Sequence, residues 1–534
     1  MDSEARGNRG EDGTREPRPM DRRRFLGAAV AGAVGAAVAA GCDSDGGGPR
    51  PGQTAPAPAG GPPQAEERNR RGDPDWRIGS LGPDEAIEGY ADRVSVLPGE
   101  EFGLHVSTTA PGFRVSAYRM GWYGGAQARR VWVSDRVAGQ RQPPPRTVPA
   151  TRSVRADWQR TLAVRTDGWP EGVYLLRLEG EHGYQRYVPM VVRSQSGAGA
   201  TVIMHAVATW QAYNTWGGGD LYEGKDGAYA TRSLEVTFDR PYDKSGAGKF
   251  IVYERALVAL AERLGIPLAY TTGVDVHASP SVLRGAAALV SLGHDEYWTP
   301  EQRRNVTQAR DAGTNLAFLG ANACFRRIRL EPSGTGEART VVCWKTAFDD
   351  DPYLAAHPDM PTNDFRQAPA PDPESSLVGM LYEGFPVDAP YVVHSPGHWL
   401  FEGTGVRQGD SFAHLVGVEY DRVTPSAPTP RPIEVLAHSP LVCQGRASHA
   451  NSAYYVAPSG AGVFASGTMR WVEALMAGTR DNGRNHDMDA RTGEFVTRTT
   501  ENLLRAFAAG PAGDTRPGPV DNVAPLYSTP LATG

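Results

Sequence analysis

The stretch Val290-Ser291-Leu292-Gly293-His294-Asp295-Glu296-Tyr297-Trp298 decides how the central part of this 534-residue chain is interpreted. The apolar run from Ala286 to Leu292 predicts a buried strand that ends at the glycine of this stretch. Because side chains alternate along an extended chain, His294 and Glu296 are expected to point to one side and Asp295 to the other. Open α/β sheets bind their ligands at the carboxyl ends of the strands, so the pair lies where such folds place their chemistry.

Two further segments repeat this arrangement of a β-rich run followed by a polar loop. Thr201 to Ala208 precedes the loop Thr209–Gly219, and Thr314 to Leu319 precedes Gly320-Ala321-Asn322. If the three runs are parallel strands, their carboxyl ends share one edge of a sheet. The three loops are therefore expected to meet.

Helical patterns lie between these runs. Apolar residues at helical spacing are Phe250, Tyr253, Leu257, Leu260 and Leu264. Gly265 is placed to end that helix. Thr299-Pro300-Glu301-Gln302 is a capping box with proline at the first helical position, and the helix it starts is expected to stop near Gly313. Strands that alternate with helices predict a mostly parallel sheet covered on both faces. Further expected elements are strands at Thr340–Trp344, Val416–Tyr420, Ile433–Ala437 and Gly462–Ala465 and a helix at about 494–508.

The region before this one has a different pattern. Short β-rich segments separated by turns, with no helical stretch, indicate an antiparallel β-sandwich. They are Val94–Val96, Phe102–Val106, Phe113–Tyr118, Trp158–Arg165, Gly172–Leu178 and Tyr187–Val192. The predicted fold is therefore a β-sandwich over residues 81–196 followed by an α/β domain over 197–510. Residues 511–534 are expected to form a flexible tail, and the Pro-rich stretch 347–376 is either a lid or a surface excursion.

The N-terminus has the pattern of an export signal. Asp21-Arg22-Arg23-Arg24-Phe25-Leu26 fits a twin-arginine motif, and the apolar run that follows is short for a membrane span. The run ends in Ala39-Ala40-Gly41-Cys42-Asp43, which resembles a lipobox. We therefore expect a signal peptide over residues 1–42, a lipid on Cys42, a disordered Pro/Gly linker over 43–80, and a location on the outer face of the cell membrane. A non-lipidated precursor or a retained anchor is the alternative.

Charge and cysteine content exclude some classes of function. The formal net charge of −6 predicts no affinity for nucleic acid, and contact with a membrane is expected only through the lipid. Four of the 55 basic residues are lysine. No Cys-x-x-Cys motif occurs, so a cysteine zinc site is not expected. Cys324 and Cys343 lie in apolar stretches and are expected to be buried thiols, with a disulfide between them as the alternative.

The loops that follow the predicted strands carry a candidate site. Tyr213, His294, Glu296 and Asn322 supply a phenol, an imidazole, a carboxylate and an amide, which suit metal-assisted or acid/base hydrolysis. Glu419 follows another apolar run and either reaches the same pocket or forms an ion pair. Each residue also has a structural interpretation, such as a buried aromatic for the tyrosine or a turn cap for the asparagine.

Other motifs give weaker indications of a functional site. No G-x-S-x-G or G-x-C-x-G elbow occurs, which disfavours a serine or cysteine nucleophile. Gly246-Ala247-Gly248-Lys249-Phe250 lacks the spacing of a phosphate loop. His394-Ser395-Pro396-Gly397-His398 could ligate a metal, although a Pro/Gly loop is its simpler interpretation.

Taken together, several motifs resemble the large (β) subunit of N,N-dimethylformamidase, over about residues 85 to 508. They are Ser116-Ala117-Tyr118-Arg119-Met120-Gly121-Trp122-Tyr123-Gly124-Gly125, Thr209-Trp210-Gln211-Ala212-Tyr213-Asn214, Gly293-His294-Asp295-Glu296-Tyr297-Trp298, Leu319-Gly320-Ala321-Asn322-Ala323-Cys324 and Gly467-Thr468-Met469-Arg470-Trp471. The resemblance implies a glutamine-amidotransferase-like α/β domain and hydrolysis of the C–N bond of a small amide. It also implies one ferric ion, Fe(III), per chain, held by two tyrosines and one carboxylate.

The resemblance assigns roles residue by residue. Glu296 matches the carboxylate ligand, and Tyr213 matches one tyrosine ligand. The second tyrosine is left open between Tyr174 and Tyr222. His294 and Asn322 match catalytic or neighbouring positions, and Glu419 matches a further glutamate of the active site. Iron would activate water and polarise the amide carbonyl, while the histidine or that glutamate moves the proton and the asparagine holds the oxyanion.

The chain also departs from the family pattern. The family enzyme is cytoplasmic and pairs a longer large subunit with a small second subunit, whereas this chain carries an export signal. Its substrate is therefore left open beyond a small amide. Its expected partner is either a small second subunit, missing from this chain, or further copies of the same chain, as a homo-oligomer. Two other interpretations remain at this stage: a surface-anchored binding protein with an inert α/β domain, and a metal-free hydrolase that uses Glu296 and His294.

Overall fold

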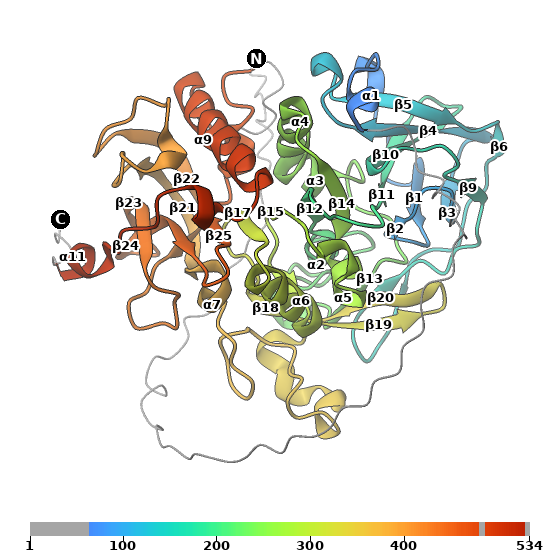
Figure 1. Ribbon diagram of the computed structural model, residues 1–534. Helices are drawn as coiled ribbons and strands as arrows, with labels where there is room; N and C mark the ends of the chain where they lie inside the picture. Colours follow the sequence, from blue (N-terminus) through green and yellow to red (C-terminus); the bar gives the residue numbers. More distant parts are fainter. Residues whose placement is uncertain (1–63, 480–485, 529–534) are drawn as a thin grey trace, which may run out of the picture. The chain divides into compact units, whose positions relative to one another are not determined.

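The computed structural model of the protein describes residues 64–479 and 486–528 (Figure 1). The expected signal peptide, Cys42 and most of the expected linker lie outside these residues. Within the described ranges, no helix is long and apolar enough to cross a membrane. The protein is of mixed α/β and β architecture: its strands form several sheets, and the described residues contain fewer helices than strands.

A seven-stranded sheet forms the centre of the α/β region, in the order β14-β12-β15-β17-β25-β24-β23. Its strands are β12 (Thr201–His205), β14 (Leu268–Thr272), β15 (Ala288–Gly293), β17 (Asn315–Gly320), β23 (Ile433–Cys443), β24 (Arg446–Val456) and β25 (Gly462–Ala465). The first five strands in this order pair in parallel, and β24 and β23 add an antiparallel edge. The mostly parallel sheet is therefore confirmed. The three runs predicted to precede polar loops, β12, β15 and β17, are neighbours in it.

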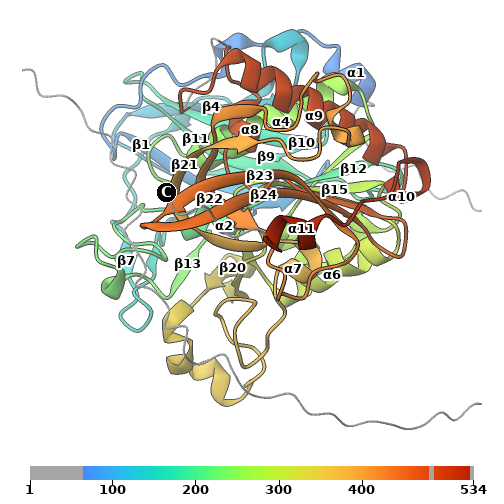
Figure 2. The ribbon, with the colours of Figure 1, turned by 90° about the vertical axis from the view of Figure 1, so that its left-hand side faces the viewer.

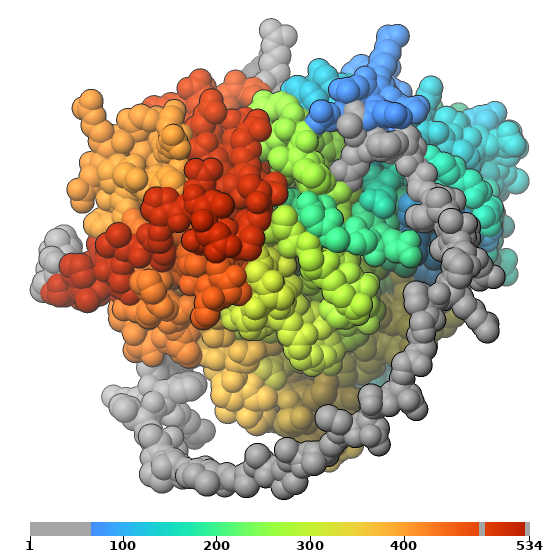
Figure 3. Space-filling model, viewed as in Figure 1, coloured from blue at the N-terminus to red at the C-terminus, as the bar shows by residue number. Residues whose placement is uncertain are grey.

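Helices cover both faces of this sheet (Figures 1 and 2). On one face lie α4 (Arg255–Leu264) and α9 (Ala490–Ala508), and on the other lie α5 (Gly273–Ala278) and α6 (Pro300–Asp311). Alternate residues of β15 reach the two cores: Val290 packs in the core that includes α4 and α9, and Leu289 packs in the core that includes α6. Figure 3 shows α9, in red, bordering the green of α4, and Arg263 and Glu501 form an ion pair between them at 2.7 Å. Burial on both faces explains the continuous apolar runs of these strands.

The helix boundaries agree with the sequence signals at all but one position. Thr299 caps α6 by accepting the Gln302 N–H, and Gly265 ends α4 in the left-handed conformation, as predicted. The single helix expected from Phe250 to Leu264 is wrong: it is divided into α3 (Gly248–Tyr253) and α4 by Glu254, whose φ and ψ are not helical. The Glu254 carboxylate instead accepts the Trp210 indole N–H at 2.7 Å, and this buried contact replaces helical continuity.

The region before the central sheet contains two sheets that share one core. One has the order β1-β3-β9, and the other has the order β2-β11-β10-β4-β5 with β6 beside β4. Their strands are β1 (Ile87–Ala91), β2 (Ser95–Val96), β3 (Glu101–Thr108), β4 (Gly112–Met120), β5 (Ala128–Val133), β6 (Val137–Ala138), β9 (Leu162–Arg165), β10 (Gly172–Gly180) and β11 (Gln185–Val192). All pairs except β2 with β11 are antiparallel. Ile87 and Leu104 from one sheet and Val115 and Leu176 from the other are fully buried together.

Two of the predicted strands lie outside the central sheet. The segment Val416–Tyr420 is part of β22 (Ser411–Arg422), which pairs with β21 (Leu381–Val392). The segment near Thr340 is part of β20 (Gly336–Val342), which pairs with β13 (Glu235–Thr237) and β19 (Arg329–Ser333). These strands pair antiparallel within small sheets of their own, and apolar periodicity does not reveal which sheet a strand joins.

A buried polar network ties the N-terminal sheets to the α/β region. Arg119 of β4 is 1% exposed and forms an ion pair with Glu262 of α4 at 2.6 Å. Its Nη1 donates to the Tyr123 hydroxyl at 2.9 Å, and the Tyr270 hydroxyl donates to the same Glu262 oxygen at 2.7 Å. The motif that begins at Ser116 therefore serves the contact between the two regions.

Candidate functional site

The three loops predicted to meet do meet at the carboxyl edge of the central sheet. Tyr213 follows α2 (Val207–Ala212), which begins two residues after β12, and His294 and Glu296 directly follow β15. The Tyr213 hydroxyl donates to Glu296 Oε2 at 2.6 Å and lies 3.4 Å from His294 Nε2. Asn322 follows β17 and joins the same site through Glu419, as described below.

Two tyrosines converge on one carboxylate, and we call Tyr213, Tyr222 and Glu296 the tyrosine–glutamate cluster. The Tyr222 hydroxyl lies 2.9 Å from each Glu296 oxygen and 2.8 Å from the Tyr213 hydroxyl. The two tyrosine rings stack with centroids 4.5 Å apart. The Tyr297 hydroxyl donates to that of Tyr222 at 2.8 Å. Glu296 and Tyr297 are each 1% exposed, whereas the Tyr213 and Tyr222 side chains are half-buried, so the carboxylate lies at the inner end of the site.

Tyr174, the other candidate for the second tyrosine, lies elsewhere. It belongs to β10, its hydroxyl donates to the Pro170 carbonyl at 2.6 Å, and its ring stacks on Trp169 at 5.0 Å. The structure does not bring Tyr174 to Glu296. Tyr222 occupies that place because the chain folds back after Tyr213 and returns to the carboxylate.

The loop that carries Tyr222 is held by backbone contacts. Asp220 is 3% exposed and its Oδ1 accepts the N–H groups of Tyr222 and Glu223 at 2.7 and 2.8 Å. The Leu221 N–H donates to the Ala212 carbonyl at 3.1 Å and closes the loop next to Tyr213. These contacts turn the Tyr222 side chain toward Glu296.

His294, Asn322 and Glu419 form a second group beside the cluster. His294 Nε2 lies 3.4 Å from Glu296 Oε2 and 3.8 Å from Glu419 Oε2. The Asn322 side chain lies near enough to Glu419 to lower the pKa of that carboxyl in part, and the Asn322 backbone N–H, at φ 60°, donates to Asp421 Oδ1 at 2.8 Å. His294 Nδ1, Asn322 Oδ1 and Glu419 Oε2 are buried without a hydrogen-bond partner among the described residues. Buried polar atoms are rarely left unpaired, so these three are poised for a ligand or water.

Cations surround the cluster. Arg326 Nε lies 3.2 Å from Glu296 Oε1. Lys345 Nζ lies 3.1 Å from the centre of the Tyr222 ring, and Lys249 Nζ lies 4.4 Å from that of Tyr213. Two of the four lysines of the chain therefore lie against these two rings, where their charge favours an electron-rich aromatic face. Sequence reasoning missed all three cations, and the scarcity of lysine was the one available signal.

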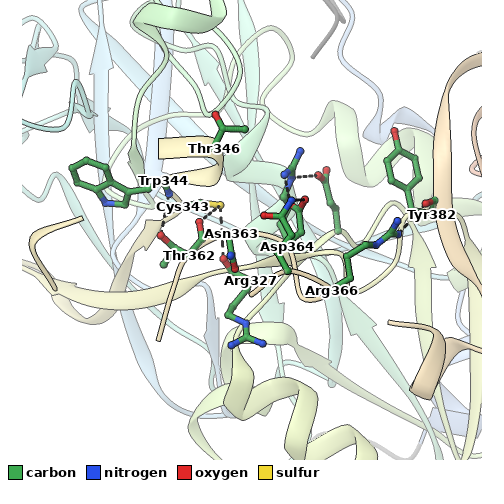
Figure 4. A network of polar contacts seen from close by, with 12 residues as sticks. Arg327, Cys343, Trp344, Thr346, Thr362, Asn363, Asp364, Arg366 and Tyr382 are labelled. Atoms are coloured by element: carbon green, nitrogen blue, oxygen red, sulfur yellow. Dashed lines mark hydrogen bonds and ion pairs between the residues drawn. The ribbon is translucent and has the colours of Figure 1, made fainter. Parts of the chain in front are cut away.

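The Pro-rich stretch 347–376 contributes to this arrangement through its returning end. Asp364 forms an ion pair with Arg326, and the Lys345 N–H donates to the Thr362 carbonyl at 2.8 Å. Figure 4 shows Thr362, Asn363, Asp364 and Arg366 beside Cys343, Trp344 and Tyr382. Arg366 Nη2 donates to the Tyr382 carbonyl at 2.9 Å. The excursion thus fixes the arginine that contacts Glu296.

The electrostatics separate the two glutamates. Burial alone would raise the pKa of Glu296, but the hydrogen bond with His294 and the charges of Arg326 and Lys345 lower that pKa to about 2. Burial and the Glu296 charge raise the pKa of Glu419 well above its usual value. Burial lowers the pKa of His294. Glu296 is therefore held in its charged form, whereas burial favours the protonated form of Glu419 and the neutral form of His294.

The phenols are kept protonated by the same forces. Burial, followed by the Glu296 charge, raises the pKa values of Tyr213 and Tyr222 well above 10. A phenol in this environment loses its proton only when a cation takes its place.

The donor atoms fit a hard metal ion. Oxygens bound cis to one octahedral ion at about 2.0 Å are about 2.8 Å apart, and the oxygens of the cluster lie 2.6 to 2.9 Å apart. Phenolates and a carboxylate are anionic oxygen donors, which suit ferric iron. Over residues 64–479 and 486–528, no group of three or more His, Cys, Asp or Glu side chains is placed to hold a metal.

Two other sequence candidates are explained by local structure. His398 Nδ1 accepts the Leu400 N–H at 3.3 Å and caps a short helical turn, and His394 lies 6.5 Å from the ring of His438. The Pro/Gly loop interpretation of this segment therefore holds. Cys324 and Cys343 are free and buried, as predicted, and no disulfide joins them.

Comparison with known proteins agrees with the motifs. The family model described as N,N-dimethylformamidase beta subunit-like, C-terminal, matches residues 114–486. A comparison with curated proteins finds no match. The matched range includes every residue of the tyrosine–glutamate cluster together with His294, Asn322 and Glu419, and it spans well over half of the chain. The chain therefore belongs to the N,N-dimethylformamidase beta subunit-like family.

Proposed function

We propose that this protein is an amidohydrolase that cleaves the C–N bond of a small linear amide with the help of one ferric ion. The observation that carries the proposal is the convergence of two phenols on the Glu296 carboxylate at 2.6 to 2.9 Å. Membership of the dimethylformamidase-like family supports amide hydrolysis. The substrate is a small amide whose identity is open.

Tyr213, Tyr222 and Glu296 would hold the ion. When bound, a ferric ion supplies Lewis acidity, which lowers the pKa of water and polarises a carbonyl. The surrounding residues tune the donors: Arg326 pairs with Glu296, and the Lys345 amine, whose pKa burial and the Arg326 charge lower to about 7, lies against the Tyr222 ring. Burial of these groups strengthens their electrostatic interactions.

The neighbouring group handles the proton. Glu419, whose raised pKa favours its protonated form, can pass a proton to the departing amine nitrogen. His294 Nε2 lies beside both Glu296 and Glu419, and the neutral imidazole can take up the proton that the attacking water releases. Asn322 can orient the carbonyl oxygen of the substrate through its side-chain N–H groups. A pair of carboxyl groups with separated pKa values is the usual basis of acid and base roles.

The metal-free hydrolase is less well supported. Such a mechanism needs Glu296 as a general base, and a carboxylate with a pKa of about 2 is a weak base at neutral pH. The inert binding protein is also less well supported, because it gives no role to the convergence of two phenols and a carboxylate in a chain of the dimethylformamidase-like family.

We further propose the finer architecture and the location. The two N-terminal sheets form a β-sandwich, and the central sheet with its helices is glutamine-amidotransferase-like. The chain is exported by the twin-arginine pathway and anchored by a lipid on Cys42. It acts either as a homo-oligomer or with a small second subunit. Labelling of cells with a radioactive fatty acid tests the anchor, since a Cys42→Ala variant should not incorporate the label.

A direct experiment tests the metal centre. Purified protein should contain about one iron per chain and show the visible absorption of ferric phenolate. Tyr222→Phe and Glu296→Ala should lose iron. Tyr174→Phe, which removes a buried hydroxyl outside the site, is the matched control and should keep it. Release of amine from a panel of small linear amides should follow iron content. A colourless protein that takes up no ferric iron would remove the basis of the proposal.

A further inference from the structure

One fully buried arginine organises the segment that carries both tyrosines. Arg240 lies three residues after β13 and is 0% exposed. Its Nη1 donates to the carbonyls of Trp216 and Gly219 at 3.3 and 2.8 Å, and its Nη2 donates to those of Gln211 and Asn214 at 3.4 and 2.8 Å. Its Nε donates to Gln211 Oε1 at 3.2 Å. Every acceptor of this guanidinium belongs to the segment 211–219.

The acceptors lie on both sides of the site tyrosines. The carbonyls of Gln211 and Asn214 are two residues before and one residue after Tyr213. The carbonyl of Gly219 directly precedes Asp220, whose side chain fixes the Tyr222 N–H at 2.7 Å. One planar side chain therefore holds the start of the loop, at the first tyrosine, and its end, just before the second.

The segment needs such a clamp. It leaves the end of α2, where backbone carbonyls lack helical partners. It then runs through three consecutive glycines, of which Gly217 and Gly218 have φ values of 74° and 91°. Glycines restrict the backbone least, so the loop has little intrinsic preference for its observed path.

The site of Arg240 is also costly for a cation. Burial lowers the pKa of Arg240 to about 10, and the charges of Asp220 and Asp243 only partly offset this. The hydrogen-bond acceptors of this guanidinium among the described residues are carbonyl and amide oxygens, and none is a carboxylate. A guanidinium buried among carbonyls loses its hydration, but its rigid planar donors fix the positions of several acceptors at once.

We propose that Arg240 is a positioning residue for the metal centre: it holds the segment 211–219 so that Tyr213 and Tyr222 face Glu296 at the same time. This inference rests on the proposed function for its effect on iron and catalysis, but the positioning itself does not depend on a metal. Arg240 touches neither Glu296 nor the tyrosine hydroxyls in any observed hydrogen bond, so its action is through the backbone.

Two variants and one control test this. Arg240→Met removes the clamp, and Arg240→Lys keeps a charge but not the planar fork. Arg119→Met is the matched control, since it removes an equally buried arginine that contacts no residue of the loop. Each protein is prepared as the full chain, and its fold is checked by circular dichroism.

Hydrogen–deuterium exchange of the metal-free proteins gives the metal-independent readout. Exchange of peptides covering residues 209–224 should become at least about tenfold faster in Arg240→Met and Arg240→Lys, and should stay at the wild-type rate in Arg119→Met. Unchanged exchange in both Arg240 variants would overturn the proposal. If Arg240→Met does not fold, Arg240→Lys decides by the same criterion.

Iron and kinetics give the second readout. At matched fold content, both Arg240 variants should shift or lose the ferric phenolate band. Their kcat should fall about 100-fold, as expected when reacting groups move by about 1 Å, with a smaller change in KM. If both Arg240 variants keep the ferric phenolate band and the kcat of the wild-type protein, the positioning role of Arg240 is also overturned. If the wild-type protein binds no iron, the proposed function fails, whereas the exchange result still decides the role of Arg240.

Discussion

Replacing Tyr222 by phenylalanine isolates one oxygen of the tyrosine–glutamate cluster. The variant keeps the ring, and with it the stacking on Tyr213 at 4.5 Å and the contact with Lys345 at 3.1 Å. It removes the hydroxyl that lies 2.9 Å from each Glu296 oxygen and 2.8 Å from the hydroxyls of Tyr213 and Tyr297. The change therefore tests the phenol oxygen and not the packing.

The cost to stability follows from these contacts. A hydrogen bond to a charged carboxylate contributes about 1.5–3 kcal/mol, and the Tyr297 hydroxyl left without its acceptor costs a further amount of about 1–3 kcal/mol. Because the energies of contacting groups are not additive, these two contributions do not simply sum. We expect the metal-free Tyr222→Phe protein to lose about 3 kcal/mol of unfolding free energy. Tyr174→Phe removes one neutral hydrogen bond and should lose about 1 kcal/mol.

Urea unfolding of the metal-free proteins, followed by intrinsic fluorescence, measures this difference. Folded samples of the same metal-free proteins are then titrated with ferric iron, and the visible band is recorded. Tyr222→Phe should bind iron at least about tenfold more weakly than Tyr174→Phe, since one anionic ligand is worth more than 1.4 kcal/mol. Equal stability and equal iron affinity in the two variants would refute the assignment of Tyr222.

Three further outcomes follow from the same structure. Removing iron from the wild-type protein with a chelator should lower its melting temperature, because a ligand that binds only the folded state stabilises it; an unchanged melting temperature on iron removal would contradict a bound ion. Burial raises the pKa of Asp421 from 3.8 to about 7, so the folded state binds more protons than the unfolded state between these pH values. As pH rises from about 4 to 7, this group should therefore lower the free energy of unfolding by up to about 1.4 kcal/mol per pH unit. Asp421→Asn should remove that part of the slope in pH-dependent urea titrations. The Trp216 indole N–H donates to Glu88 of β1 at 2.9 Å and links the tyrosine-bearing loop to the N-terminal sheets. Trp216→Ala should therefore lower the free energy of unfolding by about 3–5 kcal/mol in the same titrations and weaken iron binding. A loss of under about 1 kcal/mol would argue against this link.

The parts of the fold that local patterns determine could be predicted from the sequence. The apolar run that forms β15 and the cap at Thr299 are local signals, and both elements lie where they were expected. The loops after β12, β15 and β17 meet because neighbouring parallel strands share an edge, which the βα alternation already implied. The break at Glu254 has no local signal, because the partners of its carboxylate, His205 and Trp210, lie more than forty residues earlier in the chain.

The site was predictable where its residues directly follow strands and not where they return from loops. Glu296 and His294 directly follow β15, so their place was clear from the alternation of side chains. Tyr222 is brought back by Asp220 and Arg240, contacts that no periodicity reveals, and it therefore could not be separated from Tyr174. Arg326 and Lys345 likewise reach the cluster from segments far along the chain.

We propose that Tyr213 and Tyr222 are both ligands of one ferric ion at Glu296. Resonance Raman spectroscopy of the purified protein, excited in its visible band, detects tyrosinate bound to iron directly. We expect tyrosinate modes in the wild-type protein, reduced intensity with an altered band in each single Tyr→Phe variant, and none in the double variant. Tyrosinate modes that persist in the double variant, or a wild-type protein without them at one iron per chain, would contradict the account.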